Sequence, residues 1–399
     1  MRRILIFGTA VVTAFVTLTA SSSAQDVPTP DGWVGTWATA PGAAVANTPD
    51  GYPNYSIRNV VHTSVGGSAA RVRLANTFGE EPLTFGHVTV AVAAEAGSAR
   101  AVAGTMRDLT FGGAPSVVVP AGAEVVSDEV TLEVPADGDL LVTTFTPTPS
   151  GPVTFHEAAL QESFFTRDGD AAAEESGASY TERTPVWHYV AGVDVRGAAE
   201  GVVVTLGDSI TDGVGSVPGA NHRWPDLLSD RLDGRYGVLN AGIGGNRLLL
   251  DGPGGFGRNA LARFADDVLS VGGVRTLIVL EGINDIQQDP HQTSPDALIS
   301  AYRQLITQAH AHGIRVLGAT MTPFKGWGAW TEELESVRAT VNEFIRTSGE
   351  FDGVVDFDAA VRDPADPQRI LAAYDCGDAL HPNDAGYQAM ADAVDLSLL

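Results

Sequence analysis

The chain has 399 residues, of which 44% are hydrophobic and 18% charged, a composition typical of a folded globular protein. At roughly 100–200 residues per domain, this length predicts two domains. Its 49 acidic and 24 basic residues give a formal net charge of −25. This excess argues against a nucleic-acid partner and against stable association with an anionic membrane, because both need a concentrated basic surface.

The N-terminus has the pattern of an export signal. A basic start precedes an apolar, small-residue run from Ile4 to Ala20, and Ala24 ends a sequence typical of a cleavage site. The run is short and interrupted, which favours cleavage over a membrane anchor. We therefore expect residues 1–24 to be a signal peptide and the mature protein to be secreted. Because Cys376 is the only cysteine, no intramolecular disulfide is possible.

Residues 33–195 are predicted to form an accessory domain made of β-strands. Short runs of residues with high β-propensity alternate with turns rich in Pro, Gly and Asp. Such runs occupy residues 70–74, 117–119, 130–134 and 140–145. Frequent short strands with almost no helical periodicity favour an antiparallel β-sandwich.

Residues 200–399 show a different pattern, in which apolar runs alternate with amphipathic helices. Continuous apolar runs are typical of parallel strands buried on both faces. They cover residues 202–206, 276–280, 314–318 and 353–356, and helical periodicity covers residues 296–312 and 332–345. This alternation predicts an α/β domain in which helices cover a parallel sheet.

Functional residues of open parallel sheets gather at the carboxyl ends of the strands. The first such loop is Gly-Asp-Ser-Ile-Thr-Asp-Gly, residues 207–213. Ser209 at a strand-to-helix turn has the position of a nucleophile, and equally that of a helix N-cap. We interpret Asp208 as a hydrogen-bonding group of the loop and Asp212 as an acid in the first turn of the helix.

Two further loops offer groups that could bind a developing oxyanion. The loop at residues 240–246 contains Gly244 and Gly245, whose backbone N–H groups are unobstructed by a Cβ atom, although a tight turn would need the same glycines. The loop at residues 281–285 contains Asn284, whose amide could donate to the same oxyanion or cap the next turn.

A fourth cluster lies near the C-terminus, where Asp378 precedes His381 by three residues. This spacing lets the carboxylate reach the imidazole Nδ1 from one turn and leaves Nε2 free to act as a base. Asn383 follows at the expected start of a final helix.

Together these four blocks resemble the SGNH, or GDSL-type, hydrolase family. Gly-Asp-Ser with a glycine four residues after Ser209 matches its first block, and Gly245 matches the glycine of its second, with Gly244 as an adjacent competitor. Asn284 lies in the Gly-x-Asn-Asp of the third block, and Asp378-x-x-His381 is the last. The resemblance covers roughly residues 200–397 and is nearest to two-domain secreted relatives such as acetylxylan esterases.

This resemblance implies a flavodoxin-like α/β/α fold and a serine esterase mechanism. Ser209 would attack an ester carbonyl, His381 would take its proton and Asp378 would orient the imidazole. The backbone N–H groups of Ser209 and Gly245 and the amide of Asn284 would bind the oxyanion.

Other enzyme classes fit the sequence less well. No serine has glycine at both positions of the Gly-x-Ser-x-Gly elbow. The histidines lack the spacing of a metal site, so we expect no cofactor. Trp327 and Trp330 lie in a loop on the same side of the predicted sheet, where they could contact sugar rings or an acyl chain, or pack against a helix.

The expected activity is hydrolysis of short acyl esters, with O-acetyl groups of a plant polysaccharide such as xylan as a favoured substrate. A lipase or phospholipase acting on longer chains is the alternative within the same chemistry. A carbohydrate-binding or adhesion protein with an inert hydrolase domain is the alternative from another class. The sequence does not indicate an oligomeric state.

Overall fold

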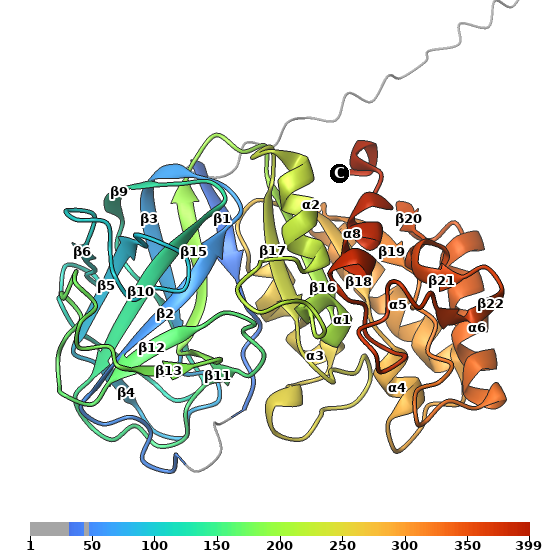
Figure 1. Cartoon of the computed structure of the whole chain (residues 1–399), viewed down its shortest axis with the longest axis horizontal. Helices are drawn as coiled ribbons and strands as arrows, with labels where there is room; N and C mark the ends of the chain where they lie inside the picture. The colour runs from blue at the N-terminus through green and yellow to red at the C-terminus, as the bar shows by residue number, and fades with distance from the viewer. Residues whose placement is uncertain (1–31, 44–47) are drawn as a thin grey trace, which may run out of the picture.

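The computed structural model describes residues 32–43 and 48–399. In the described part of the chain up to Arg196 the regular elements are β-strands, and an α/β unit follows from Val202. The two halves lie side by side in Figure 1, with the α/β unit on the right. No helix in the described ranges is long and apolar enough to cross a membrane. The predicted signal peptide, residues 1–24, lies outside these ranges.

Two antiparallel sheets face each other in the N-terminal half, which confirms the predicted sandwich. The five-stranded sheet consists of β1 (Trp33–Ala38), β15 (Val190–Arg196), β3 (Gly67–Ala75), β8 (Glu124–Val126) and β9 (Val130–Val134). The six-stranded sheet consists of β13 (Glu182–Thr184), β12 (Ser163–Thr166), β2 (Tyr55–Thr63), β10 (Gly138–Thr146), β5 (His87–Val92) and β6 (Arg107–Asp108). Side chains without solvent exposure fill the space between them, including Val61, Val72, Val90, Leu140 and Val193.

Smaller strand pairs complete this half. They are β4 (Leu83–Phe85) with β7 (Val117–Val119), and β11 (Phe155–His156) with β14 (Trp187–His188). The pair β11–β14 matters for function because it lies where the two halves meet, as described below.

A five-stranded parallel sheet forms the centre of the C-terminal half. Its strands, in spatial order, are β17 (Gly237–Gly242), β16 (Val202–Gly207), β18 (Val274–Leu280), β19 (Arg315–Ala319) and β20 (Gly353–Val355). Numbered by their order in this sheet, the strands are arranged 2-1-3-4-5, which is the flavodoxin-like order. The predicted α/β/α fold is therefore confirmed, including the strands expected from continuous apolar runs.

Helices cover both faces of this sheet. On one face lie α2 (Trp224–Leu232), α7 (Phe357–Val361) and α8 (Asp384–Asp392). On the other lie α3 (Ala260–Phe264), the π-helical turn η3 (Ala265–Leu269), α5 (Pro295–Ala311) and α6 (Glu332–Thr347). The remaining elements are α1 (Ser209–Asp212), α4 (Ile283–Gln287), the 3-10 turns η2 (Gly254–Phe256) and η4 (Leu396–Leu398), and the hairpin β21 (Arg362–Asp363)–β22 (Asp366–Ile370).

Strand β1 of the N-terminal half packs against β17, the edge strand of the parallel sheet. A methyl group added at Gly237 would overlap the carbonyl oxygen of Gly35, and one added at Gly35 would lie 2.8 Å from Leu239 Cδ1. The backbone N–H of Val238 donates to Ser64 Oγ at 3.0 Å. One hydrophobic core runs through both halves as a result.

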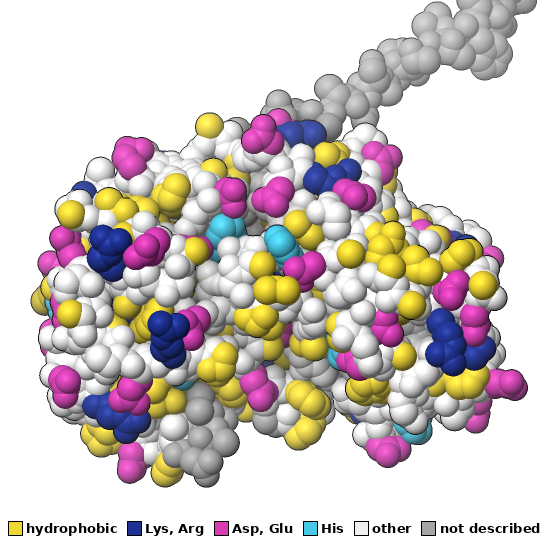
Figure 2. All heavy atoms as spheres, in the orientation of Figure 1, with side chains coloured by type: hydrophobic (Ala, Val, Ile, Leu, Met, Phe, Trp, Pro, Cys, Tyr) yellow, Lys and Arg dark blue, Asp and Glu magenta, His cyan; other side chains and the backbone are white. Residues whose placement is uncertain are grey.

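Acidic and basic side chains are mixed on the face of the molecule drawn in Figure 2. Figure 2 shows acidic side chains spread over one face, with the fewer Lys and Arg side chains lying among or beside them. This face offers no extended basic area, in keeping with the formal net charge of −25.

Candidate active site

The predicted site loops start from three neighbouring strands. β16 ends at Gly207, β17 at Gly242 and β18 at Leu280, and β16 lies between the other two. Each loop follows directly after one of these ends. Open parallel sheets bind ligands in the crevice at this edge.

The side chain of His381 connects Ser209 with Asp378. Its Nε2 lies 2.8 Å from Ser209 Oγ, and its Nδ1 lies 2.6 Å from Asp378 Oδ2. Ser209 is 7% and His381 9% exposed, so solvent competes little for these bonds. With Nδ1 donating to the carboxylate, the lone pair of Nε2 is directed at the serine hydroxyl, which can donate its proton there. The structure thus brings together the three residues that the sequence predicted as nucleophile, base and orienting acid.

The spacing of three residues makes the Asp378 carboxylate the centre of a tight turn. Its Oδ1 accepts from the backbone N–H groups of Leu380 and His381, both at 2.9 Å. Partial burial alone would raise the pKa of Asp378, but the hydrogen bonds from the His381 ring and from these N–H groups hold that pKa below its ordinary value. The carboxylate is therefore charged and fixed in position at neutral pH.

Ser209 is the first residue of α1, and its hydroxyl is not the cap of that helix. Asp208 is the N-cap residue, and its Oδ1 accepts from the N–H of Ile210 at 2.9 Å. The N-cap interpretation of Ser209 is therefore wrong, and the interpretation of Asp208 as a hydrogen-bonding group of the loop is confirmed. Gly213, at φ 107°, ends the turn with a conformation that suits glycine.

Hydrogen bonding separates the two glycines that compete for the oxyanion role. The N–H of Gly244 donates to Asp212 Oδ2 at 2.9 Å. Within residues 32–43 and 48–399, the N–H groups of Gly245 and Ser209 have no hydrogen-bond acceptor. Gly245 adopts φ 74°, which a side chain would strain. This pattern favours Gly245 as the donor.

Asn284 lies in α4, where it is 2% exposed. Its Nδ2 donates to the carbonyl of Asn246 at 2.9 Å, which leaves the second N–H of the amide for another acceptor. Its Oδ1 accepts from Gln287 and Gln288 at 2.7 and 3.0 Å. These bonds fix which way the amide faces, as an oxyanion donor requires, and the capping interpretation of Asn284 is wrong because Gly282 is the N-cap residue.

Arg263, on α3, ties the strand ends together and was not predicted from the sequence. Its guanidinium donates to the carbonyls of Gly207 at 3.0 Å and Ala241 at 2.7 Å, and to Asn246 Oδ1 at 3.0 Å. It also lies 3.3 Å from Glu281 Oε1. One buried side chain thereby fixes the relative positions of all three site loops. A single arginine on a short helix carries no sequence pattern that would have revealed this.

Three buried acids lie beneath the nucleophile. Burial raises the pKa values of Asp208 and Asp285, and raises that of Glu281 well above its ordinary value. The charge of Asp208 adds to the effect on Glu281, while Arg263 opposes it.

Residues 205–389 match the sequence profile of the GDSL-like lipase/acylhydrolase family. The chain carries a GDSL-like acylhydrolase domain. It is accordingly a carboxylic ester hydrolase, as the four sequence blocks predicted. No curated protein matches the sequence.

Solved structures resemble the acylhydrolase domain at low sequence identity. An acetyl xylan esterase is 22% identical, with a TM-score of 0.37, over 48% of this chain and 96% of its own. A carbohydrate acetylesterase from Sinorhizobium meliloti is 18% identical, with a TM-score of 0.39, over 48% and 95%. An aryl esterase from M. smegmatis is 18% identical, with a TM-score of 0.40, over 48% and 95%.

The N-terminal half contributes a buried histidine to the surroundings of the acylhydrolase site. His156 Nε2 lies 2.9 Å from Asp212 Oδ1, and the two side chains are 4% and 3% exposed. The sequence had indicated Asp212 only as an acid in the first turn of α1. No motif links two residues from different halves of the chain, so this contact was missed.

The two predicted tryptophans differ in their relation to the site. The ring of Trp327 lies edge-on to that of His381, with centroids 6.2 Å apart, and its Nε1 donates to Gln287 Oε1 at 2.9 Å. Trp330 lies beside Lys325, and its own Nε1 is buried without a hydrogen-bond partner in the described ranges. Trp327 is thus next to the base. Trp330 contacts Trp327, to whose carbonyl its backbone N–H donates at 3.0 Å.

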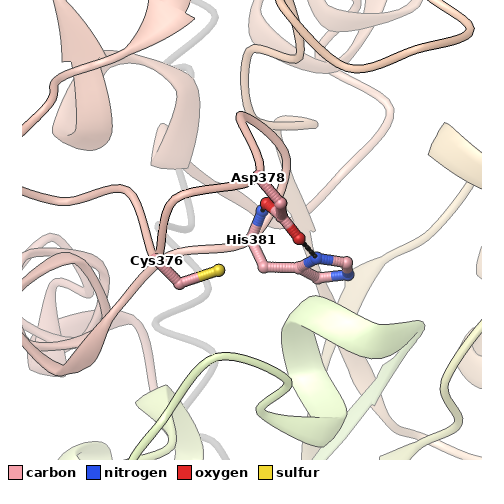
Figure 3. Close-up of side chains that lie close together, drawn as sticks. All are labelled: Cys376, Asp378 and His381. Atoms are coloured by element: carbon pink, nitrogen blue, oxygen red, sulfur yellow. Dashed lines mark hydrogen bonds and ion pairs between the residues drawn. The ribbon is translucent and has the colours of Figure 1, made fainter.

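Cys376, Asp378 and His381 form a possible metal-binding group within the described part of the chain, with ligand atoms within 4.8 Å of one another. Figure 3 shows the thiol of Cys376 pointing towards the side chain of His381, which is bonded to Asp378. Both ring nitrogens of His381 already have partners, and burial raises the pKa of Cys376. These residues therefore fit a hydrogen-bonded catalytic group better than a metal centre.

Among the cavities along the junction of the halves, two share Glu157 and Ala158 in their lining. One of about 260 Å³ is bordered by residues of the second site loop, by Phe256 and by residues 156–158. The other, of about 370 Å³, continues past Glu157 and Ala158 towards Arg183 and Pro218. The ring of Phe256 lies against Gly245, since a methyl group there would be 2.7 Å from it, so the smaller cavity adjoins the candidate oxyanion donor.

Proposed function

We propose that the chain is a secreted serine esterase that hydrolyses short acyl esters through an acyl-enzyme on Ser209. The observation that carries this proposal is the continuous chain of hydrogen bonds from Asp378 through His381 to Ser209. The chemistry needs a nucleophile in contact with a base, and a third group that orients the base.

In the proposed reaction, Ser209 Oγ attacks the ester carbonyl while its proton passes to His381 Nε2. Asp378 stabilises the resulting imidazolium through its bond to Nδ1. The negative charge that develops on the carbonyl oxygen is bound by the N–H groups of Ser209 and Gly245 and the free N–H of Asn284. His381 then protonates the leaving alcohol, and water, deprotonated by the same base, releases the acid.

The size of the smaller cavity supports a short acyl group. Its volume of about 260 Å³ is below the ~300–1,000 Å³ of pockets that enclose drug-sized ligands. The larger cavity adjoining it offers the buried Gln161, whose Oε1 has no hydrogen-bond partner in the described ranges. A sugar hydroxyl would satisfy that oxygen, which supports an O-acetylated polysaccharide such as xylan as substrate.

A series of nitrophenyl esters from acetate to decanoate tests the acyl preference. We expect kcat/KM to be highest for acetate and to fall with chain length, and a maximum at octanoate or longer would contradict the proposal. Ser209→Ala is expected to abolish turnover of all of them. Undiminished turnover by this variant would show that the assigned nucleophile is wrong.

The natural substrate is tested by measuring acetate released from acetylated xylan, acetylated pectin and lipid esters by equal amounts of enzyme. We expect the highest rate with xylan. Export is tested on the protein recovered from the culture medium of an expressing cell, where we expect the N-terminal residue to be Gln25. A mature protein that still begins at Met1 would contradict the proposed signal peptide.

The two-domain division, with residues 33–195 as an accessory unit and residues 200–399 as the catalytic unit, is part of the same proposal. The accessory unit would shape the cavities and contact the polysaccharide. Because residues 157, 158 and 160–162 line the larger cavity, substitutions there are a milder test than deletion of the unit. We expect Gln161→Ala to raise KM for acetylated xylan and leave KM for nitrophenyl acetate unchanged.

A further inference from the structure

His156 connects the N-terminal half to the active-site loops through a single carboxylate. It lies on β11, and its Nδ1 is 2.8 Å from the carbonyl oxygen of Ala40. Its Nε2 is 2.9 Å from Asp212 Oδ1, on the last residue of α1. The imidazole is therefore held at both nitrogens and has little freedom to move.

Asp212 uses its second oxygen to hold the loop that follows β17. Its Oδ2 accepts from the N–H of Gly244 at 2.9 Å. The same loop lies directly on α1, since a methyl group added at Gly242 would overlap the backbone nitrogen of Asp212. The position of this loop therefore depends on where the Asp212 carboxylate lies.

The bond to Gly244 determines which N–H remains available. With the Gly244 N–H turned to Asp212, the next N–H, that of Gly245, is left without an acceptor in the described structure. Loss of the Asp212 contact would free the loop to turn the Gly245 N–H away from the carbonyl oxygen of a bound ester. A displacement of less than 1 Å weakens such a donor strongly, because catalysis depends on its placement before the reaction.

We propose that His156 is a positioning residue for ester hydrolysis, which fixes the oxyanion donor Gly245 through Asp212 and Gly244. This inference rests on the proposed function of the site. It makes the N-terminal half a part of the catalytic apparatus, beyond any contact with substrate.

The hydrogen-bond partners also define the charge of the histidine. A carbonyl oxygen and a carboxylate both accept hydrogen bonds, so the two contacts favour a His156 ring with a proton on each nitrogen. Burial lowers the pKa of His156, but the charge of Asp212 and the bonds to Asp212 and Ala40 outweigh this effect, and the pKa lies above its ordinary value. Arg223, which stacks on the neighbouring Trp187 at 5.7 Å, acts in the opposite direction.

The test compares His156→Ala with His156→Gln, and Asp212→Ala with Asp212→Asn. The glutamine amide can still donate to Asp212, and Asn at position 212 can accept from Gly244 while donating to a neutral His156. His87→Ala is the control, because both ring nitrogens of His87 are likewise hydrogen-bonded, to the carboxylates of Asp108 and Asp170, in the same half. Each variant is first checked for a native circular dichroism spectrum.

Two quantities are then measured. The first is kcat and KM for nitrophenyl acetate, and the second is the affinity for a short alkyl boronic acid, whose tetrahedral adduct on Ser209 places an oxygen where the oxyanion forms. Loss of one complete oxyanion donor costs about 10²–10³ in kcat. For a donor that is misplaced but present, we expect a loss of about 10- to 100-fold in both His156→Ala and Asp212→Ala. KM should change by less than about threefold, and boronic acid affinity should fall in parallel with kcat.

The conservative variants and the control separate positioning from general destabilisation. Asp212→Asn and His156→Gln should recover most of the activity lost in the alanine variants, and His87→Ala should keep wild-type values. Folded alanine variants whose kcat and boronic acid affinity stay within twofold of the His87→Ala control would overturn the proposal. So would a loss of activity with unchanged boronic acid affinity.

If both alanine variants fail to fold, the comparison of Asp212→Asn with the wild type decides. Near-wild-type kcat and boronic acid affinity in Asp212→Asn support positioning by hydrogen bonds, and a loss above 100-fold overturns it. A wrong assignment of the function would give a different result from a wrong assignment of His156. In that case the wild-type protein does not hydrolyse nitrophenyl acetate, or Ser209→Ala retains its activity.

Discussion

Asn284→Ala is the sharpest single test of the oxyanion site. The amide of Asn284 has one N–H on the carbonyl of Asn246 and the other free for substrate. It also accepts from Gln287 and Gln288. Alanine therefore removes the proposed donor. It also removes the hydrogen bond that joins the loop after β18 to the loop after β17.

The magnitude follows from these contacts. An oxyanion donor contributes about 2.7–4 kcal/mol to transition-state stabilisation, a factor of about 10²–10³ in kcat. Loss of the loop bond adds to this, so we expect a loss in kcat towards 10³, with KM changed less than threefold. The buried carbonyl of Asn246 loses its partner, which costs about 1–3 kcal/mol in unfolding free energy.

The assay is steady-state hydrolysis of nitrophenyl acetate, with urea unfolding of the same preparation. Asn76→Ala is the control, since Asn76 is equally buried and its side-chain amide donates to backbone carbonyls of the N-terminal half, those of Glu81, Val119 and Pro120. We expect the control to lose stability and keep kcat. If Asn284→Ala keeps kcat within fivefold of wild type, or loses activity only through KM, the assignment of Asn284 as an oxyanion donor is refuted.

Four further outcomes are expected. The charge of Asp212 and its bond to His156 raise the pKa of that histidine, so the pair stabilises the fold fully below pH 6.5 and loses this contribution as the pH rises through the raised pKa. Urea unfolding at several pH values should therefore show a pH-dependent difference in stability between wild type and His156→Gln. A difference that does not change with pH would contradict this prediction. Cys376→Ser and treatment with EDTA should both leave kcat/KM within twofold of wild type, since both nitrogens of His381 are occupied by hydrogen bonds. If EDTA abolishes activity and added metal restores it, the site uses a metal. Trp327→Ala should lower kcat/KM by about 2- to 10-fold, because an edge-on aromatic contact contributes ~0.5–1.5 kcal/mol. Trp327→Phe keeps an aromatic ring and should lose less. Equal losses in the two variants would contradict a role for the ring. Calorimetry should give one unfolding transition for the two halves because they share a core, whereas two separate transitions would mean that they unfold independently.

The parts of the structure that were predictable depend on contacts close in sequence or on repeated patterns. The strand from Val202 was recognisable because burial on both faces demands a continuous apolar run. The turn from Asp378 to His381 was recognisable because its bonds span only three residues. The oxyanion loops became recognisable only through the joint resemblance of four separated blocks.

The parts that were not predictable join residues without a pattern. His156 meets Asp212 across 56 positions, and Arg263 meets the ends of three strands through a geometry that no spacing encodes. The close packing of β1 on β17 does have a signal in the sequence. A glycine within a strand often marks a close approach of another backbone, and Gly237 opens β17 where Gly35 of β1 packs against it.

The packing of β1 against β17 affects how the chain folds during translation. β1 is synthesised about 200 residues before its partner, and N-terminal units generally fold first during synthesis. The part of β1 at Val34 and Gly35 is therefore exposed to solvent until β17 has been synthesised. A nascent chain that stops in this interval exposes an apolar strand to its neighbours. The protein thus depends on complete translation before its first strand finds its final contact, and truncated chains are expected to aggregate.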